Sequence, residues 1–190
     1  MLLFHSTPID NFLKILKDGK LRPSIKTSED GQRPGKYLPY VFFNTIPKTQ
    51  LETMLELNGV GICFDCEILL NKIFYAASSH TAGNLKKAHK FKLSVKKDIN
   101  KILYSLYLYS VKANNSTKND PDRKKLTKSA WKKWIFIAFQ EVFSKIEPSL
   151  NDAKYIILKK KDSKLIAQIK DKFPNIIIIT SKNEKNKKKK

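Results

Sequence analysis

LLFHSTPIDNFLKILKDGKL, residues 2–21, is the stretch that decides the fold. Its first three residues are apolar and are typical of a short buried strand. Thr7 is a good helix cap, and Pro8 suits the first position of a helix. Gly19 is a typical C-terminal stop for that helix. The stretch therefore predicts a strand that leads directly into a helix, with His5 at the junction.

The apolar residues of this predicted helix recur at intervals of three and four. Positions i, i+3, i+4 and i+7 share one face of an α-helix. We expect that face to be buried against the rest of the domain. Its members are Ile9, Phe12, Leu13 and Leu16.

The rest of the chain mixes strand and helix patterns without regular βαβ alternation, which indicates the α+β class. Apolar helical spacing predicts a long helix over 97–115, and residues 135–144 carry both helix and strand signals. Residues 22–36 are polar and rich in Gly, Pro and Ser, and predict a loop. Further strands are expected at 40–45, at the start of 59–70, and at 153–160 and 175–181; further helices are expected at 48–58 and 162–173, and an irregular segment at 72–84.

The chain has a large excess of positive charge, with a formal net charge of +21 over 190 residues. Residues 86–133 hold +12 of it and residues 182–190 hold +5. Such a chain attracts polyanions, namely nucleic acid, an anionic membrane face or a phosphorylated ligand. Lysine predominates over arginine, and its flexible point charge suits phosphate contact better than base reading. An AT-rich genome enriches lysine too, and explains the same excess without any partner.

Aromatic residues lie among these lysines. Rings interleaved with cations can stack on bases while the lysines hold phosphates. The same tyrosines and tryptophans can instead be core residues of helices whose wet side carries the lysines. The lysines that we expect to contact nucleic acid are Lys124, Lys125, Lys132 and Lys133.

Cys63 and Cys66 form a CxxC pair, which is found in half zinc sites and in redox pairs. There is no second pair, and the three histidines do not have ligand spacing. We therefore expect two ordinary reduced thiols and no metal. So few cysteines argue against a disulfide scaffold and hence against secretion. No apolar run approaches the length of a membrane span, and MLLF is too short for a signal peptide.

These observations predict an intracellular protein with no membrane partner. We expect residues 1–181 to form a single domain and residues 182–190 to form a disordered, lysine-rich tail.

The opening stretch resembles the first motif of the ADP-ribosyltransferase superfamily, which includes the poly-ADP-ribose polymerases. It is most similar to the DNA-targeting ADP-ribosyltransferase toxins, in which His-x-Thr, Ile-Asp-Asn, Ile-Leu and a glycine also follow in this order. The resemblance implies an α+β fold with a split, mixed and antiparallel β-sheet core and flanking helices. It also implies that His5, Ser6 and Thr7 hold NAD. The alternative for His5 is a half-buried histidine that is bonded to a backbone group.

GKYLPYVFFNTIPKT, residues 35–49, more loosely resembles the second motif of the superfamily. The resemblance implies that Tyr40 stacks on the nicotinamide ring of NAD, with Phe42 as its neighbour on the same strand face. The alternative is that Tyr40 is a core aromatic. The toxins place an arginine near residues 44–48, where this chain has none. Arg22 and Arg33, in or beside the polar loop, are candidates to clamp the pyrophosphate.

AFQEVFSKIEPSLNDAKYIIL, residues 138–158, resembles the third motif, in which a strand carries a glutamate. This resemblance implies that Glu141 is the catalytic carboxylate. The alternative is a glutamate on a solvent-facing strand surface.

The activity implied by the resemblance is transfer of ADP-ribose from NAD, without a metal. The glycosidic bond to nicotinamide breaks through an oxocarbenium-like transition state, which a nearby carboxylate stabilises. The basic surface favours nucleic acid, or a protein associated with it, as the acceptor. The rival hypothesis is a non-enzymatic basic protein that binds or packages nucleic acid, and a degenerate family member with a structural role is a third. An enzyme predicts that His5, Tyr40 and Glu141 surround one cleft, whereas the rival predicts that Glu141 lies away from His5.

Overall fold

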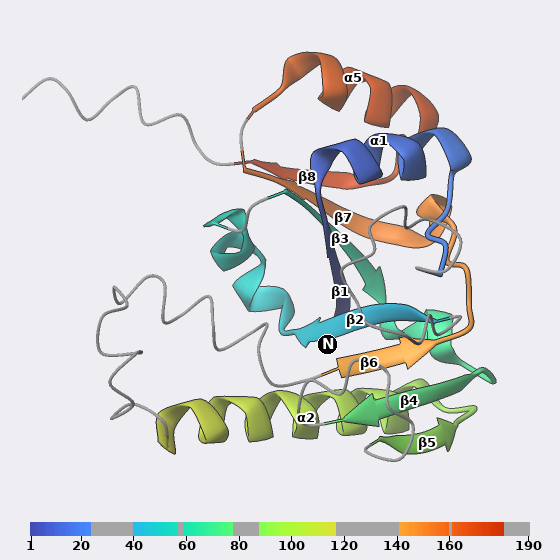
Figure 1. Cartoon of the computed structure of the whole chain (residues 1–190), viewed down its shortest axis with the longest axis vertical. Helices are drawn as coiled ribbons and strands as arrows, with labels where there is room; N and C mark the ends of the chain where they lie inside the picture. The colour runs from blue at the N-terminus through green and yellow to red at the C-terminus, as the bar shows by residue number, and fades with distance from the viewer. Residues whose placement is uncertain (24–39, 57–58, 78–87, 117–140, 160, 181–190) are drawn as a thin grey trace, which may run out of the picture.

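In a computed structural model, residues 1–23, 40–56, 59–77, 88–116, 141–159 and 161–180 are described. They form one mixed sheet with helices packed against it (Figure 1). The strands are β1 (Leu2–Thr7), β2 (Val41–Ile46), β3 (Val60–Asp65), β4 (Ile73–Ala77), β5 (His89–Lys92), β6 (Glu141–Ser144), β7 (Ala153–Leu158) and β8 (Ile177–Thr180). The α-helices are α1 (Ile9–Asp18), α2 (Lys96–Ser116) and α5 (Ser163–Lys172), and the 3-10 helices are η2 (Lys48–Glu56), η3 (Cys66–Leu69) and η5 (Leu150–Asp152).

The eight strands of the sheet follow the order β5-β4-β6-β2-β1-β3-β7-β8. All neighbouring pairs are antiparallel except β7 and β8, which are parallel and are connected through α5. A parallel pair needs such a crossover, whereas antiparallel neighbours do not. The predicted α+β class and the mixed, mainly antiparallel sheet are confirmed.

Strand β2 joins two halves of the sheet because its two ends pair with different strands. Its C-terminal half pairs with the start of β1, from Ile46 opposite Leu2 to Asn44 opposite Phe4. Its N-terminal half, Val41–Phe43, pairs with β6 on its other side. The end of β1 continues to pair with β3 as far as Thr7. The register between β1 and β2 therefore stops after Phe4, and the sheet splits between residues 5–7 and 40–43.

Helix α1 begins one residue later than the sequence predicts. Thr7 is not its cap but the last residue of β1, and Pro8 occupies the N-cap position without a side-chain cap hydrogen bond. Gly19 ends the helix as predicted, with a left-handed φ of 72° and its N–H bonded to the carbonyl oxygen of Ile15. This conformation favours glycine because a Cβ is strained there.

The predicted buried face of α1 is partly wrong. Phe12 and Leu16 are buried, but Ile9 and Leu13 are 43% and 45% exposed, and Ile15 is buried instead. The helix is rotated by a fraction of a turn from the expected orientation, since Phe12, Ile15 and Leu16 also lie at intervals of three and four. This rotation turns the residues next to Ile15 toward the split in the sheet.

Two buried clusters cover the two faces of the sheet. The larger cluster contains Phe12 of α1, Leu165 of α5 and Leu103 of α2, packed on alternate strand residues such as Ile62 and Val142. Figure 1 shows α1 and α5 above β7 and β8, and α2 at the bottom of the view, below β6. The smaller cluster is on the other face and is covered by η2; it contains Leu2, Phe4, Ile46, Leu51, Met54, Cys63, Tyr155 and Ile157.

Several expectations about secondary structure are confirmed and one is wrong. The strands at 41–46, 60–65, 153–158 and 177–180 and the helices α2 and α5 form close to the predicted positions. The segment 48–56 is a 3-10 helix. Residues 73–77, predicted as part of an irregular segment, form β4. Ile73, Phe74 and Tyr75 favour a strand, whereas Ala76 and Ala77 do not. These two small residues pair with Val142 and Glu141 of β6.

The two cysteines are free and buried, in agreement with the prediction of ordinary thiols. Burial raises the pKa of both thiols, that of Cys66 to about 11. The described residues contain no group of three or more His, Cys, Asp or Glu that could hold a metal ion. None of the helices in the described ranges is long and apolar enough to cross a membrane.

Candidate active site in the split of the sheet

A cavity of about 240 Å³ lies at the split between β1 and β2. Its walls include consecutive residues of both strands, 5–7 and 41–42, so it runs between the strands rather than over one face. The side chains of α1 close one side. The lining residues are His5, Ser6, Thr7, Pro8, Asn11, Lys14, Ile15, Asp18, Lys20, Leu21, Arg22, Tyr40, Val41 and Phe42.

Five of the residues expected to bind NAD line the cavity: His5, Ser6, Thr7, Arg22 and Tyr40. The sixth, Arg33, lies outside the described residues. Residues 5–7 reach it at the end of β1, and residue 40 reaches it just before β2 begins. Two segments more than thirty residues apart in sequence thus meet at one site.

The His5 side chain bridges the split. Its Nδ1–H donates a hydrogen bond to the carbonyl oxygen of Phe42 over 2.9 Å, because a carbonyl can only accept. Burial lowers the pKa of His5, while the bond to Phe42 opposes part of that shift. A neutral ring that donates from Nδ1 keeps a lone pair on Nε2, so His5 can accept a hydrogen bond from a ligand hydroxyl. The backbone-bonded histidine and the ligand-binding histidine are therefore compatible.

The backbone of β1 also faces the split. In an antiparallel sheet, alternate residues direct their N–H and C=O groups toward each neighbouring strand. The register of β1 with β2 covers only Leu2–Phe4, so between His5 and Thr7 the groups directed toward β2 have no strand partner there. Buried backbone groups need hydrogen bonds, and a ligand in the cavity can supply them.

Positive charge gathers on the α1 side of the cavity. The Nε atom of Arg22 lies 3.0 Å from Oδ2 of Asp18, as an ion pair without the alignment of a hydrogen bond. Lys20 pairs with Glu147 over 2.7 Å. Lys14 is exposed and makes no ion pair in the described part of the chain. The cavity therefore offers cations to an anionic group at its mouth.

Tyr40 is packed more tightly than a stacking residue requires. Its side chain is 4% exposed, with Tyr75 and Phe143 edge-on at ring-centroid distances of 5.7 and 5.2 Å. Burial raises the pKa of Tyr40, and the charge of Tyr75 and a side-chain hydrogen bond to it add to the shift. In this arrangement little of the ring face is open to a stacked ligand.

Glu141 lies away from the cavity wall. It is the first residue of β6, opposite Ala77 of β4, and is 2% exposed. The alternative of a solvent-facing glutamate is wrong. Glu141 shares its strand face with Phe143, whose ring lies 5.5 Å from that of Phe42, a residue of the cavity. The carboxylate is thus on the strand next to the cavity but is not one of its lining groups.

Several residues that the sequence predicts to bind a partner, and the predicted tail, lie outside the described residues: Arg33, Lys124, Lys125, Lys132, Lys133 and residues 182–190.

Three lining residues of α1 were not predicted from the sequence: Asn11, Lys14 and Asp18. Their spacing of three and four was a usable signal, because it places them on one face of α1. That face adjoins Ile15, whose burial was not predicted.

The chain is similar in fold to proteins of known structure. The structure of Thermus sp. 2.9 DarT in complex with carba-NAD+ superposes with a TM-score of 0.53 at 19% sequence identity, covering 95% of each chain. The same protein in complex with NAD+ gives a TM-score of 0.52 at 17% identity, covering 95% of this chain and 94% of that one. The chain has the DarT fold. Neither a protein-family model nor a curated protein matches the sequence.

The superposition covers nearly the whole length of both chains. The similarity is therefore one of the whole fold and not of a single motif. At these identities it is the fold that is shared. The predicted ADP-ribosyltransferase-like architecture is confirmed at that level.

Proposed function

We propose that the chain is an NAD-dependent ADP-ribosyltransferase that modifies nucleic acid. The observation that carries the proposal is the cavity in the split of the sheet, which gathers five of the residues expected to bind NAD. The DarT fold supports it, because Thermus sp. 2.9 DarT was solved in complex with NAD+. The resemblance of residues 3–21 to DNA-targeting toxins supports the same class.

The cavity suits one end of the dinucleotide. Sites for small molecules usually have volumes of about 300 to 1,000 Å³, and about 240 Å³ is below that range. A ribose with its attached ring fits, with Nε2 of His5 and those backbone groups of residues 5–7 that face the split as partners for amide and hydroxyl groups. The pyrophosphate would then lie toward Lys14 and Arg22 at the mouth.

The reaction needs stabilisation of positive charge on the ribose. As the bond from C1′ to the nicotinamide nitrogen breaks, the electron pair leaves with nicotinamide and the ribose becomes an oxocarbenium ion. Glu141 is proposed to stabilise that ion and to take the proton of the attacking acceptor atom. Since Glu141 is on the neighbouring strand β6 and is not a lining residue of the cavity, this role requires it to face the ribose when NAD is bound.

The proposed acceptor is nucleic acid because of charge. A chain with a net charge of +21 attracts a phosphate backbone, and its lysines suit contacts that do not depend on sequence.

The experiment that tests the function is incubation with labelled NAD, alone and with single- or double-stranded DNA or RNA. Label on a nucleic acid, with release of nicotinamide, is the expected result. Glu141→Gln, which keeps the shape and removes the charge, should reduce transfer by about 10²- to 10⁴-fold. Glu52→Gln removes an exposed carboxylate of η2 and is the matched control. No NAD binding and no nicotinamide release from the wild type would refute the proposal.

The rival function is a non-enzymatic nucleic-acid-binding protein derived from the same fold. The position of Glu141 outside the cavity wall favours it. In that case NAD binding is absent or unproductive, Glu141→Gln leaves nucleic-acid binding unchanged, and affinity falls steeply with salt.

A further inference from the structure

We infer that the outer edge of β8 is a binding site for an extended, acidic segment of a partner protein, which adds to the sheet as a further strand. This inference goes beyond the proposed function and does not depend on it. β8 is the last strand of the sheet, and among the described residues it pairs only with β7. β3 and β7 separate it from β1 and the NAD cavity.

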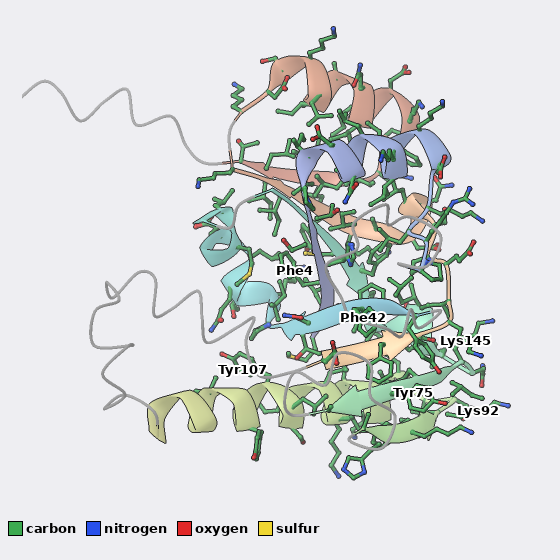
Figure 2. The ribbon with its side chains drawn as sticks, in the orientation of Figure 1. Phe4, Phe42, Tyr75, Lys92, Tyr107 and Lys145 are labelled. Atoms are coloured by element: carbon green, nitrogen blue, oxygen red, sulfur yellow. The ribbon has the colours of Figure 1, made fainter. Side chains whose placement is uncertain are left out.

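The two edge strands of the sheet differ in charge. β5, at the opposite edge, carries the exposed side chains of Lys90 and Lys92. Figure 2 shows Lys92 at the rim of the molecule. Lysines on a short edge strand hinder the addition of another strand. β8 consists of three isoleucines and one threonine and carries no charge, so its sequence favours strand addition.

The exposure of β8 is that of a strand that lacks one neighbour. Ile177 is 54% exposed, whereas Tyr155, its partner on β7, is 9% exposed. Ile178 is partly buried against the larger hydrophobic cluster, and Ile179 is partly buried against the smaller one. An added strand would cover more apolar surface on both faces of β8.

Other elements extend this apolar surface on each face of the sheet. Figure 1 shows α5 above β8, and η2 contacts β8 on the face of the smaller cluster. Ile166 of α5 and Leu55 of η2 are partly buried against the larger and the smaller cluster. When a strand is added to a sheet edge, main-chain hydrogen bonds supply affinity and alternate side chains supply specificity. The centre of the partner segment should therefore be apolar on both of its faces.

Positive charge is concentrated around β8. Lys159 and Lys161 are exposed just after β7, at the end where the last residues of β7 and β8 pair. At the other end, Lys170 donates a hydrogen bond from Nζ to the carbonyl oxygen of Ile176 over 2.6 Å. Residues 159–190 contain twelve lysines and three acidic residues, which gives a net charge of +9.

This charge selects the occupant of the edge. A segment with acidic residues on both sides of its apolar centre complements the lysines and is steered toward them. A second copy of the chain could pair its own β8 with this edge, but it carries the same net charge of +21 and is repelled. The fitting occupant is therefore an acidic segment of another protein.

The test uses three fluorescent peptides and the full chain. The first peptide is Glu-Asp-Val-Ile-Val-Thr-Val-Glu-Asp. The second has lysines in place of its four acidic residues, and the third has prolines in place of two of its valines, so that it keeps the charge but cannot form a strand ladder. Binding is measured by anisotropy, and amide exchange of β8 is followed with and without the first peptide.

The protein variant is Ile177→Asn, and the matched control is Ile73→Asn. Ile73 is also an exposed strand isoleucine, at 45% exposure, but lies on β4. Neither change alters the charge, and thermal unfolding checks that both variants fold. NAD binding should be the same in both, since neither residue lines the NAD cavity.

We expect the acidic peptide to bind at least about tenfold more tightly than the lysine peptide at about 50 mM salt. The proline peptide should not bind, and amide exchange of β8 should slow when the acidic peptide is added. Ile177→Asn should weaken binding by about fivefold or more and Ile73→Asn should not, because only Ile177 contacts the added strand.

Three results would overturn the inference. Equal binding of the acidic and proline peptides would show that charge alone attracts them. Equal effects of the two asparagine variants would show that β8 is not the site. A dimer in sedimentation that Ile177→Asn abolishes would assign the edge to a second copy of the chain.

Discussion

His5 connects two strands that otherwise separate, and its protonation state decides how it does so. In the folded chain the ring is neutral near pH 7, because burial lowers its pKa below 6.5. In the unfolded chain it binds a proton as the pH falls through about 6.5. Unfolding therefore takes up a proton below that pH. The free energy of unfolding falls as the pH is lowered from about 6.5 to the folded pKa of His5, and below that pKa the loss no longer grows.

The corresponding prediction concerns the pH dependence of stability. Urea unfolding of the wild type between pH 7 and pH 5 should show a larger loss than unfolding of His5→Gln, which cannot titrate. His89→Gln, on the edge strand β5 and exposed, is the control and should follow the wild type. If His5→Gln and the wild type lose the same free energy, His5 does not titrate in this range as the structure implies.

Protonation also reverses the ligand chemistry of His5. A charged ring donates from both nitrogens and has no lone pair left for a hydroxyl. We therefore predict that NAD affinity falls only as the pH is lowered through the folded-state pKa of His5, which burial holds below 6.5, as measured by calorimetry from pH 8 downward. The affinity of His5→Gln should be lower at pH 8 but should not change with pH.

At the scale of the elements, Gly61 sets how closely β1, β3 and β7 can pack. A Cβ added there would lie 2.5 Å from Cε2 of Phe4 and 3.3 Å from Cβ of Ile157. We predict that Gly61→Ala destabilises the fold by about 1 to 3 kcal/mol, because the Phe4 ring must move. For a chain of this size that is a fall of roughly 2 to 12 °C in Tm, measured by circular dichroism.

A double mutant tests whether the contact with Phe4 causes the loss of stability in Gly61→Ala. Phe4→Leu removes the atoms that the new methyl group meets, so Gly61→Ala should cost less in that background. Additive effects would show that the loss arises elsewhere in the strand.

Gly19 gives a contrasting case at the end of α1. A Cβ there would meet nothing nearer than Cζ of Phe173 at 3.9 Å, but φ is 72°. We predict that Gly19→Ala costs about 1 kcal/mol through backbone strain alone, and that Gly19→Asn recovers part of it. Chemical denaturation of both variants measures this, and equal stability of the alanine variant and the wild type would contradict it.

The elements were predictable where local signals are strong. The apolar runs of β1, β7 and β8 and the glycine stop of α1 depend on neighbouring residues only. The missed strand β4 depends on its neighbours in space, since Ala76 and Ala77 have little strand preference of their own and are held by β6. The exposed Ile9 and Leu13 show the same limit, because helical spacing does not say which of two overlapping faces is covered.

Some features of the candidate site were likewise predictable from local sequence and others were not. Residues 5–7 are contiguous, so one motif located them together. The split that makes room for a ligand arises from the register of β2 with two strands, which no local pattern contains. The position of Glu141 on β6, the strand next to β2, also depends on that register.

At the scale of the whole molecule, one hydrophobic cluster spans both halves of the split sheet. It includes Ile62 and Ile156 from one half and Phe74 and Val142 from the other. We predict a single cooperative unfolding transition, because neither half can lose its packing alone.

The two buried thiols provide a probe of this unfolding transition. Pulsed labelling of Cys63 and Cys66 across a urea gradient should give the same midpoint as far-UV circular dichroism. A thiol transition at lower urea would show that the half containing β3 opens first.

The backbone groups of residues 5–7 that are directed toward β2, rather than toward the β3 ladder, also have a kinetic consequence. Amide protons without a strand partner exchange with solvent faster than their neighbours in the ladder. A ligand that fills the split supplies the missing acceptors, and exchange at the end of β1 should then slow while the β1–β3 ladder stays as it was. The gap between two strands thus makes ligand occupancy readable from amide exchange at the end of β1.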